Sequence, residues 1–470
     1  MKREKYVNYF MAGLLITALL AACATPTPVP TEEPPAPAPT EAMEEPTEAP
    51  MEPTEPVSMI DADPTGQTVV WWHAFGTGAN YEGIQAVVAE FNAANEYGIT
   101  VTEISQGSQS DLETAVNAAI ATGELPNLTM GFANGLVRWY GLDVIAGLNQ
   151  YIDDPVFGLS AEELAAIYPG PYSSGTLPDG TQVGIPMHQS AQVNFYNHTW
   201  AQELGFPEPP TTSAEFKEQA CAAAAANNAD DNPDNDGTGG YVYFPGASTV
   251  LPWIWAFGGD VVTEDGTGYV LNSQAAIDVA MYFKDLIDSG CTLSTPSFPN
   301  PEFAGRLALF ATSSTAGIPF QQSAMDDAGN QDVWGAIAFP GPDGTNYVNA
   351  FGQMIGVVRT NPDQDLASWL FLKWLTSPEG QSLWISRTGF FPSQTTTDVG
   401  TRPTDDPLWA GALELLASAK AEPNLAAHGA VRGEIQDAYF AIVDAATEAD
   451  VIAILDALNE TAVQLVAETQ

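Results

Sequence analysis

Apolar positions around residue 70 follow two different periods. Residues 68–72 (TVVWW) are β-branched and aromatic, which favours a strand. In the next segment, Ile84, Val87, Val88 and Phe91 recur at the spacing of one helix face. Both patterns repeat, so the predicted order is a strand at 68–72, a helix at 81–95, a strand at 99–105, a helix at 112–120 and a strand at 128–132. This alternation predicts a mostly parallel α/β sheet with right-handed crossovers.

Three loops follow the predicted strands of this sheet, at 72–76 (WHAFG), 106–108 (QGS) and 131–134 (GFAN). Ligands bind outside the carboxyl ends of parallel strands. These loops are therefore expected to carry ligand contacts.

The rest of the chain shows helix and strand signals without an internal repeat. Thr212 and Glu215 have capping-box spacing, which predicts the start of a helix. Further predicted elements are a strand ending near Pro186, a strand starting near Val193, helices at 273–289 and 367–374, and Ala-rich helices at the C-terminus.

The first 23 residues have the pattern of a secretory signal. Basic residues at positions 2, 3 and 5 precede an apolar run at 10–20 that is too short to span a membrane. The run ends in Leu20, Ala21, Ala22 and Cys23, which is typical of a lipoprotein processing site. We expect a lipidated Cys23 to hold the mature protein at the outer face of the bacterial cell membrane, in the periplasm where an outer membrane exists. The alternative is an ordinary signal peptide with an incidental cysteine.

Residues 24–56 consist almost wholly of Pro, Thr, Glu and Ala, with no basic and no aromatic residue. Such a composition cannot bury enough apolar surface to offset the entropy of ordering. We expect a disordered, extended stalk over 24–66 and a folded part that begins at 67.

The folded part spans roughly 400 residues, which exceeds what one hydrophobic core usually organises. Two lobes are expected. The chain carries 59 acidic and 13 basic residues, a net charge of −46. This field disfavours nucleic acid and anionic lipid and favours neutral or cationic ligands, although solubility alone would also explain it.

After Cys23 only Cys221 and Cys291 remain. Outside the cytoplasm an even pair of cysteines favours a disulfide, and we expect these two to be bridged. The alternative is that each is a small buried apolar residue.

An acidic loop, DDNPDNDGTGG, places Asn232, Asp234 and Asp236 at alternating positions before Gly237. This is the first half of an EF-hand-like loop, so the three residues are a candidate structural Ca²⁺ site. The twelfth position is Tyr243 rather than glutamate. The alternative is a polar surface turn, and no other cofactor is expected.

Catalytic motifs are missing from the sequence. The four histidines, at positions 73, 188, 198 and 428, lack zinc-site spacing, and neither a G-x-S-x-G elbow nor a P-loop occurs. We expect no enzyme activity. A secreted glycoside hydrolase that uses two of the many carboxylates is the alternative.

Several motifs from residue 68 to the C-terminus carry a family resemblance. They are, in order, TVVWWHAFG, AAIATGELPNLTMG, GIPMHQSAQVNFYN, PPTTSAEF, WAFGGD, FAGRLALF, LASWLFLKWLTSPEG and RTGFFPS. Together they resemble the extracellular solute-binding proteins (family 1) that feed ABC importers of sugars. Each motif alone is mostly structural glycine, proline and core aromatic residues.

The resemblance implies a two-lobed, type II periplasmic-binding-protein-like fold, in which each lobe is a mixed, mostly parallel sheet flanked by helices. The chain would cross a three-segment hinge near Pro186, Gly352 and Ser393, and the lobes would close around the ligand. The first lobe would comprise 67–186 and 353–393, and the second 187–352 and 394–470.

The resemblance also implies the function. As a monomer that does not bind nucleic acid, the protein would capture a neutral mono- or oligosaccharide and deliver it to membrane permease subunits of an ABC importer. Sugars need flat aromatic rings beside directed polar groups. The candidate ligand-binding residues are Trp72, Trp253, Trp255 and Phe390 for stacking, with His73, Gln106, Asn134, Gln189, Ser313, Ser314, Gly352 and Gln353 for polar contacts.

Two of the motifs, ATSSTAG and RTGFFP, look most like the branch that includes glycerol-phosphate binders. Phe390 stands where such members often carry a tyrosine. Arg387 and Arg432 are the only basic residues near expected cleft segments in the C-terminal quarter. A glycerol-phosphate-type ligand is therefore the alternative to an uncharged sugar.

Overall fold

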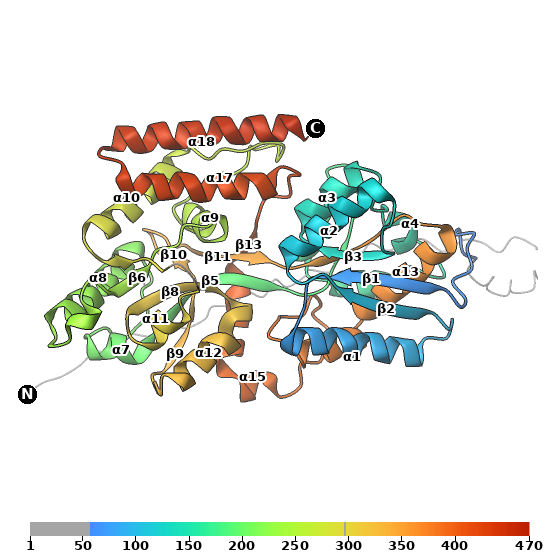
Figure 1. Ribbon diagram of the computed structural model, residues 1–470, viewed down its shortest axis with the longest axis horizontal. Helices are drawn as coiled ribbons and strands as arrows, with labels where there is room; N and C mark the ends of the chain where they lie inside the picture. Colours follow the sequence, from blue (N-terminus) through green and yellow to red (C-terminus); the bar gives the residue numbers. More distant parts are fainter. Residues whose placement is uncertain (1–56, 296–297, 470) are drawn as a thin grey trace, which may run out of the picture. The chain divides into compact units, whose positions relative to one another are not determined.

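Two β-sheets organise the computed structural model, which describes residues 57–295 and 298–469 (Figure 1). From residue 56 onward the chain forms one compact unit. The signal segment, Cys23 and the stalk to residue 56 lie outside the described residues. Within the described part, the helices are all too short or too polar to cross a membrane.

The first sheet has the strand order β2-β1-β3-β12-β4. β1 pairs in parallel with β2 and β3, whereas β12 is antiparallel to both β3 and β4. The parallel strands β1, β2 and β3 alternate with helices along the chain, so the predicted order of strands and helices is confirmed. The strands are β1 (Thr68–His73), β2 (Thr100–Ser105), β3 (Leu128–Gly131), β4 (Ile185–Pro186) and β12 (Met354–Val357).

Helices cover this sheet in two groups. α1 packs against α13 and α14 and buries the predicted face of Ile84, Val87, Val88 and Phe91. α2 and α3 lie together on the other side, with α1 along the lower edge of the sheet in Figure 1. The helices are α1 (Gly78–Ala94), α2 (Gln109–Thr122), α3 (Ala133–Gly141), α4 (Asn149–Ile152), α5 (Ala161–Ala166), α6 (Pro169–Ser174), α13 (Pro362–Leu375) and α14 (Pro378–Ile385).

The second sheet has the order β10-β11-β5-β8-β6-β7, with β9 beside β5 and β13 beside β11. β5 is antiparallel to its neighbours β8, β9 and β11, and β6 is parallel to β7 and β8. The sheet is thus more antiparallel than expected, because β5 leaves the first crossing segment whereas β11 leads into the second, so the two neighbouring strands run in opposite directions. Its strands are β5 (Ser190–Asn197), β6 (Gly239–Val242), β7 (Thr292–Leu293), β8 (Ala308–Ser314), β9 (Trp334–Ile337), β10 (Phe339–Pro340), β11 (Asn346–Phe351) and β13 (Ala419–Ala421).

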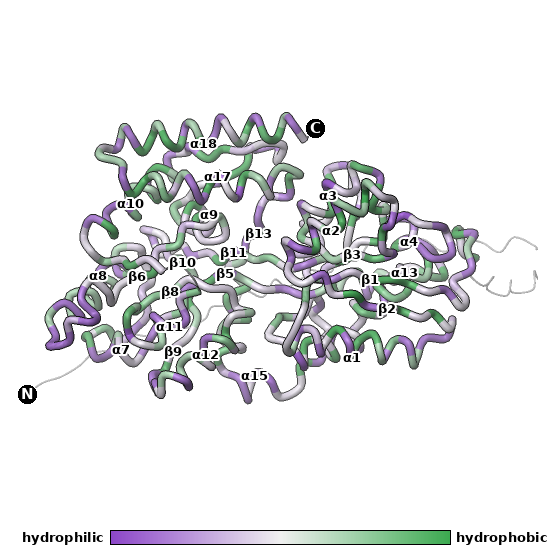
Figure 2. The backbone as a smooth tube through the Cα atoms, viewed as in Figure 1, coloured by the Kyte–Doolittle hydropathy of each residue, from purple (hydrophilic) through white to green (hydrophobic). Residues whose placement is uncertain are grey.

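The remaining helices lie between β5 and β12 or after α14 in the chain. α18 alternates between hydrophilic and hydrophobic stretches along its length in Figure 2, and its buried residues face α17 and α10. The helices are α7 (His198–Glu203), α8 (Ser213–Ala229), α9 (Ala247–Ala256), α10 (Gln274–Asp288), α11 (Asn300–Ala304), α12 (Ile318–Asp327), α15 (Arg402–Asp405), α16 (Pro407–Glu414), α17 (His428–Ala441) and α18 (Glu448–Glu468). Four 3₁₀ turns are η1 (Pro233–Asn235), η2 (Thr315–Gly317), η3 (Leu415–Ser418) and η4 (Ile442–Asp444).

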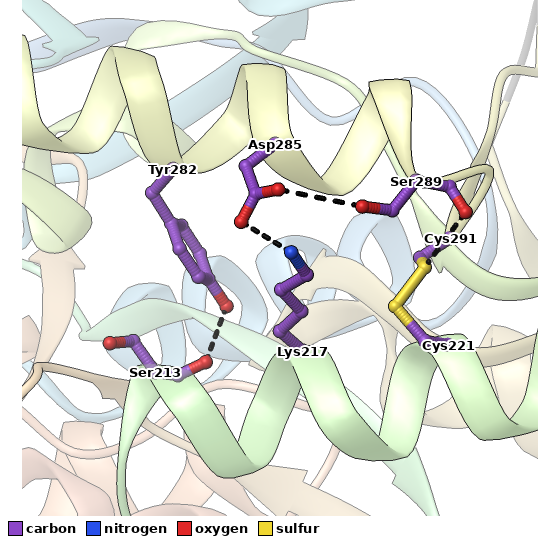
Figure 3. Close-up of a disulfide and its surroundings, with 7 residues drawn as sticks. All are labelled: Ser213, Lys217, Cys221, Tyr282, Asp285, Ser289 and Cys291. Carbon is purple, nitrogen blue, oxygen red and sulfur yellow. Dashed lines mark hydrogen bonds and ion pairs between the residues drawn. A yellow bond between two sulfur atoms is a disulfide. The ribbon is translucent and has the colours of Figure 1, made fainter.

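A disulfide joins Cys221 and Cys291, the pair expected from the sequence, and links α8 to the segment that follows α10 (Figure 3). The same two helices are held by an ion pair between Lys217 and Asp285. The Tyr282 hydroxyl donates to the backbone oxygen of Ser213 over 2.8 Å. The α8–α10 pair is therefore fixed along its length by one covalent and two polar contacts.

The chain passes from the first sheet to the second between β4 and β5, and returns between β11 and β12. The two crossing segments touch at Gly352, where an added Cβ would lie 2.1 Å from the backbone oxygen of His188. Only glycine allows this approach. The segment around Phe391, near the third expected crossing, forms a bridge with Gln189. The residue limits of the two lobes stay a prediction.

Asp154 ties the first described residues to the first sheet. Its carboxylate, 4% exposed, accepts hydrogen bonds from Ser58 Oγ (2.8 Å), Met59 N (2.8 Å) and two backbone N–H groups of its own loop. Ile60 and Ala62 pack against the first core. The expected stalk limit of 66 is therefore corrected, because residues 57–66 have enough apolar and polar contacts to pack.

Candidate functional site

A cavity of about 1050 Å³ lies where segments attached to the first sheet meet segments attached to the second. The first sheet contributes the beginnings of α2 and α3, together with α6. The second contributes the chain from the end of α16 to the start of α17, and both crossing segments form the floor between them. The cavity thus opens at the carboxyl ends of β2 and β3, where the sequence predicted ligand contacts.

Amide side chains line the cavity on the side of the first sheet, together with the carboxylate of Glu113. Gln109 begins α2, whose start is fixed by a capping box between Ser108 and Asp111. Gln109 Nε2 donates to Glu113 Oε1 (3.0 Å), and its Oε1 accepts from Gln353 Nε2 (3.3 Å). Asn134 stands in the first turn of α3. These groups can donate to and accept from hydroxyl groups.

Half-buried aromatic rings form the apolar part of the lining. Phe132, which follows β3 of the first sheet, and Phe351, which ends β11 of the second, meet edge to face with centroids 6.4 Å apart. Tyr168 precedes α6 and also lines the cavity. Such rings can cover the C–H face of a sugar.

A charged cluster lies on the opposite wall. The Glu422 carboxylate accepts from Ser248 Oγ (2.8 Å) and Asn349 Nδ2 (2.7 Å) on one oxygen. Its other oxygen accepts from His428 Nε2 (2.6 Å) and from the Arg432 guanidinium. These five residues are called the Glu422 cluster below.

The carboxylate of this cluster is ionised although only 11% of its side chain is exposed. Burial alone would raise the pKa of Glu422, but the hydrogen bond from His428 and the charge of Arg432 outweigh it and hold the pKa far below its usual range. Behind the cluster, the Tyr269 hydroxyl lies 2.7 Å from His428 Nδ1. Burial raises the pKa of Tyr269, so its hydroxyl keeps its proton.

His188 lies in the first crossing segment, is buried and lines the cavity. Its ring stacks on Phe390 at 3.7 Å and lies near Phe75 and Trp384. Burial lowers the pKa of His188 to about 3, against a smaller opposing effect of a hydrogen bond with Gln353. His188 is therefore neutral at physiological pH.

The cavity brings together three of the candidate residues from the sequence: Asn134, Gln189 and Gly352 line it. Gln353 is not part of the lining, but its side chain donates a hydrogen bond to Gln109, which is. Phe390 lies behind His188 rather than on the wall.

The three tryptophan candidates lie outside the cavity lining. Trp253 is fully buried among the aromatic residues of the second core, and Trp255 is 2% exposed with Lys420 Nζ 5.3 Å from its ring centre. Trp72 packs against the first core. The two α9 tryptophans are core residues because α9 packs against β11 and is buried over most of its length.

Four polar candidates also lie away from the cavity. His73 is buried, with Nε2 2.9 Å from Glu103 Oε2. Ser313 and Ser314 lie within β8, paired with β5, and Gln106 follows β2. None of the four is part of the cavity lining.

The candidate calcium loop has its own internal hydrogen bonds. Asn232 Oδ1 accepts from Asp234 N (3.2 Å), and Asp230 accepts from Asn232 N and Asn235 Nδ2. Over the described residues, the acidic, histidine and cysteine side chains do not gather into a set of three suited to a metal ion. Calcium at Asn232, Asp234 and Asp236 stays a prediction.

Most of the cavity residues missed from the sequence lie on segments with weak local signals. Tyr168 precedes the short helix α6 and Phe351 ends strand β11, and neither is part of a motif that indicates ligand binding. Arg432, which the sequence placed near the expected cleft, does line the cavity, whereas Arg387 does not. His428 stands four residues before Arg432, on the same face of α17, and this spacing could have identified it.

Residues 86–410, more than half of the chain, match the family model of bacterial extracellular solute-binding proteins. The chain belongs to this family. Among curated relatives, this solute-binding protein is similar to a binding protein of Brucella abortus (strain 2308). The two are 23% identical over 332 residues, which cover 64% of this chain and 76% of the relative.

Solved structures share the fold of this solute-binding protein. The cyclic α-maltosyl-1,6-maltose binding protein of Arthrobacter globiformis matches with a TM-score of 0.71 at 24% identity, over 85% of this chain and 99% of that one. The sugar-binding protein MalE of Xanthomonas citri matches with 0.71 at 20%, over 86% and 98%. UgpB of Mycobacterium tuberculosis, in complex with glycerophosphocholine, matches with 0.70 at 15%, over 85% and 98%. The two-lobed α/β fold expected from the sequence is confirmed.

Proposed function

We propose that this solute-binding protein captures an uncharged mono- or oligosaccharide in the cavity and delivers it to the permease of an ABC importer. One observation carries the proposal: aromatic rings and neutral amides line a single cavity reached from both sheets. The rings can stack on C–H faces while the amides exchange hydrogen bonds with hydroxyl groups. The residues concerned are Phe132, Tyr168 and Phe351 with Gln109, Asn134 and Gln189.

The size of the cavity favours more than one sugar ring. Ligand pockets commonly measure about 300–1,000 Å³. At about 1050 Å³ this cavity lies just above that range. The fold neighbours that bind a cyclic maltosyl-maltose and other sugars support an oligosaccharide ligand.

The test is a ligand panel of mono- and oligosaccharides, read by thermal shift and then by calorimetry. One or a few sugars should raise the melting temperature without being converted to product. Tyr168→Ala should weaken binding at least about tenfold, since the ring covers apolar ligand surface. Phe320→Ala, which removes a 69% exposed ring outside the cavity, is the matched control and should change nothing. Product formation, or no response to any sugar, would contradict the proposal.

A glycerol-phosphate-type ligand is the second candidate, because Arg432 lines the cavity and UgpB has the same fold. Arg432 is already paired with the Glu422 carboxylate, which argues against a phosphate-bearing ligand. A thermal shift with glycerophosphocholine alone, and with no sugar, would favour this alternative.

Retention at the cell surface completes the proposal. A lipid on Cys23 would anchor a monomeric protein outside the cytoplasmic membrane, and the Pro-rich segment before residue 57 would let it reach the permease. The family's extracellular character supports this location. The protein would act by binding and release, without catalysis.

A further inference from the structure

Glu422 lines the cavity but has no hydrogen-bonding capacity left for a ligand. A carboxylate offers about four lone-pair sites. In the structure two donors meet each of its oxygens: Ser248 and Asn349 on one, His428 and Arg432 on the other. Its effect on a ligand must therefore pass through one of these partners.

Arg432 is the partner that can touch a ligand. Its side chain is 41% exposed, and it lines both the main cavity and a neighbouring hollow of about 210 Å³. One N–H group donates to Glu422 and another to Ser248 Oγ (3.0 Å). A guanidinium carries five N–H donors in a rigid plane, so donors remain that are held in a fixed direction.

The charge of Arg432 is nevertheless cancelled locally. Glu422 neutralises it at contact distance, and the other carboxylates on the cavity wall are those of Glu113 and Glu414. Three carboxylates thus face one guanidinium. An anionic ligand would meet hydrogen-bond donors but no net positive charge.

We propose that Glu422 determines whether the protein binds neutral or anionic ligands. It holds the N–H donors of Arg432 in a direction suited to hydroxyl groups, and it cancels the positive charge of Arg432. Ligands that carry a phosphate or a carboxylate are therefore excluded. The inference rests on the proposed function for the neutral ligand, whereas the exclusion of anions can be measured without knowing the sugar. Glu422 acts as a positioning residue and Arg432 as the contact.

The test is the isosteric variant Glu422→Gln in the full chain, probed with inorganic phosphate and with glycerol 3-phosphate. Its amide can keep the hydrogen bonds from Ser248 and Asn349, and the exposed part of Arg432 can be hydrated, so we expect a folded protein. Wild-type protein should bind neither anion. Glu422→Gln should gain at least about tenfold in affinity for both, and the gain should shrink as salt rises.

Three variants control for the source of the gain. Glu414→Gln removes the same charge from an exposed position on the cavity wall and should not produce anion binding. Glu422→Asp keeps the charge and should not produce it either. The double variant Glu422→Gln with Arg432→Gln should lose the gain, because the cation is gone.

Several outcomes would overturn the inference: anion binding by wild-type protein that Arg432→Gln abolishes, no gain in Glu422→Gln, or an equal gain in Glu414→Gln. If no sugar binds but the anion results follow the expected pattern, the proposed function fails and the inference on charge stands. If Glu422→Gln does not fold, Arg432→Gln decides. It should weaken the sugar found in the panel at least about tenfold, and unchanged affinity would refute the role of Arg432.

Discussion

Gly352 should be the least replaceable glycine of the crossing segments. An added Cβ would lie 2.1 Å from the backbone oxygen of His188, 3.1 Å from its carbonyl carbon and 3.4 Å from Cα of Gln189. Comfortable contact between such atoms begins near 3.5 Å, so the segments would have to separate by more than about 1 Å. Neither clashing group is the end of a flexible side chain. Gly352→Ala should therefore lower the free energy of unfolding by about 1–3 kcal/mol, as overpacking does elsewhere.

The assay is urea denaturation of Gly352→Ala beside Gly411→Ala. Gly411 stands in α16 with nothing within 4 Å of its virtual Cβ, so alanine there should stabilise the protein by up to about 1 kcal/mol through helix propensity. The ligand affinity of Gly352→Ala should also fall. Gln189 lines the cavity from one of the two segments that would be displaced. A Gly352→Ala protein as stable as wild type, with unchanged affinity, would refute the reasoning.

Two further predictions follow from the disulfide and from His188. Reduction, or replacement of Cys221 and Cys291 by alanine, should lower the free energy of unfolding by about 4 kcal/mol, since the bond closes a loop of 70 residues. Equal urea midpoints with and without reductant would contradict this. His188 has a folded-state pKa of about 3 against 6.5 when unfolded, so only the unfolded chain takes up a proton as the pH falls below 6.5. Wild type should lose about 2 kcal/mol more than His188→Phe between pH 7 and pH 5, and parallel losses in paired denaturation curves would show that His188 does not titrate in this way.

Local patterns in the chain were enough to predict much of the first sheet and several helices outside it. The face of Ile84, Val87, Val88 and Phe91, the capping box at Thr212 and the helix at 273–289 all occur where expected. The second sheet was harder to predict, because β5, β8 and β11 pair across more than a hundred residues, and local periodicity carries no information on such pairing.

The cavity was predicted in its general place but only partly in its residues. Asn134, Gln189 and Gly352 were identified because they follow strand ends or a crossing. Trp253 and Trp255 were chosen for their chemistry, yet burial of α9 gives them packing roles. A tryptophan beside glycines has the same local sequence whether it faces a ligand or a core, and only the tertiary packing distinguishes the two.

The Asp154 carboxylate also determines how mechanical load would enter the folded protein. Tension on the chain before residue 57 would first reach Ser58 and Met59 and pass through one acceptor group into the loop at 154–157. From there it would run into α13, where Trp369 Nε1 donates to the Phe157 oxygen over 3.0 Å. From Trp369 the load would pass into the first sheet, because α13 packs against β1 and β12.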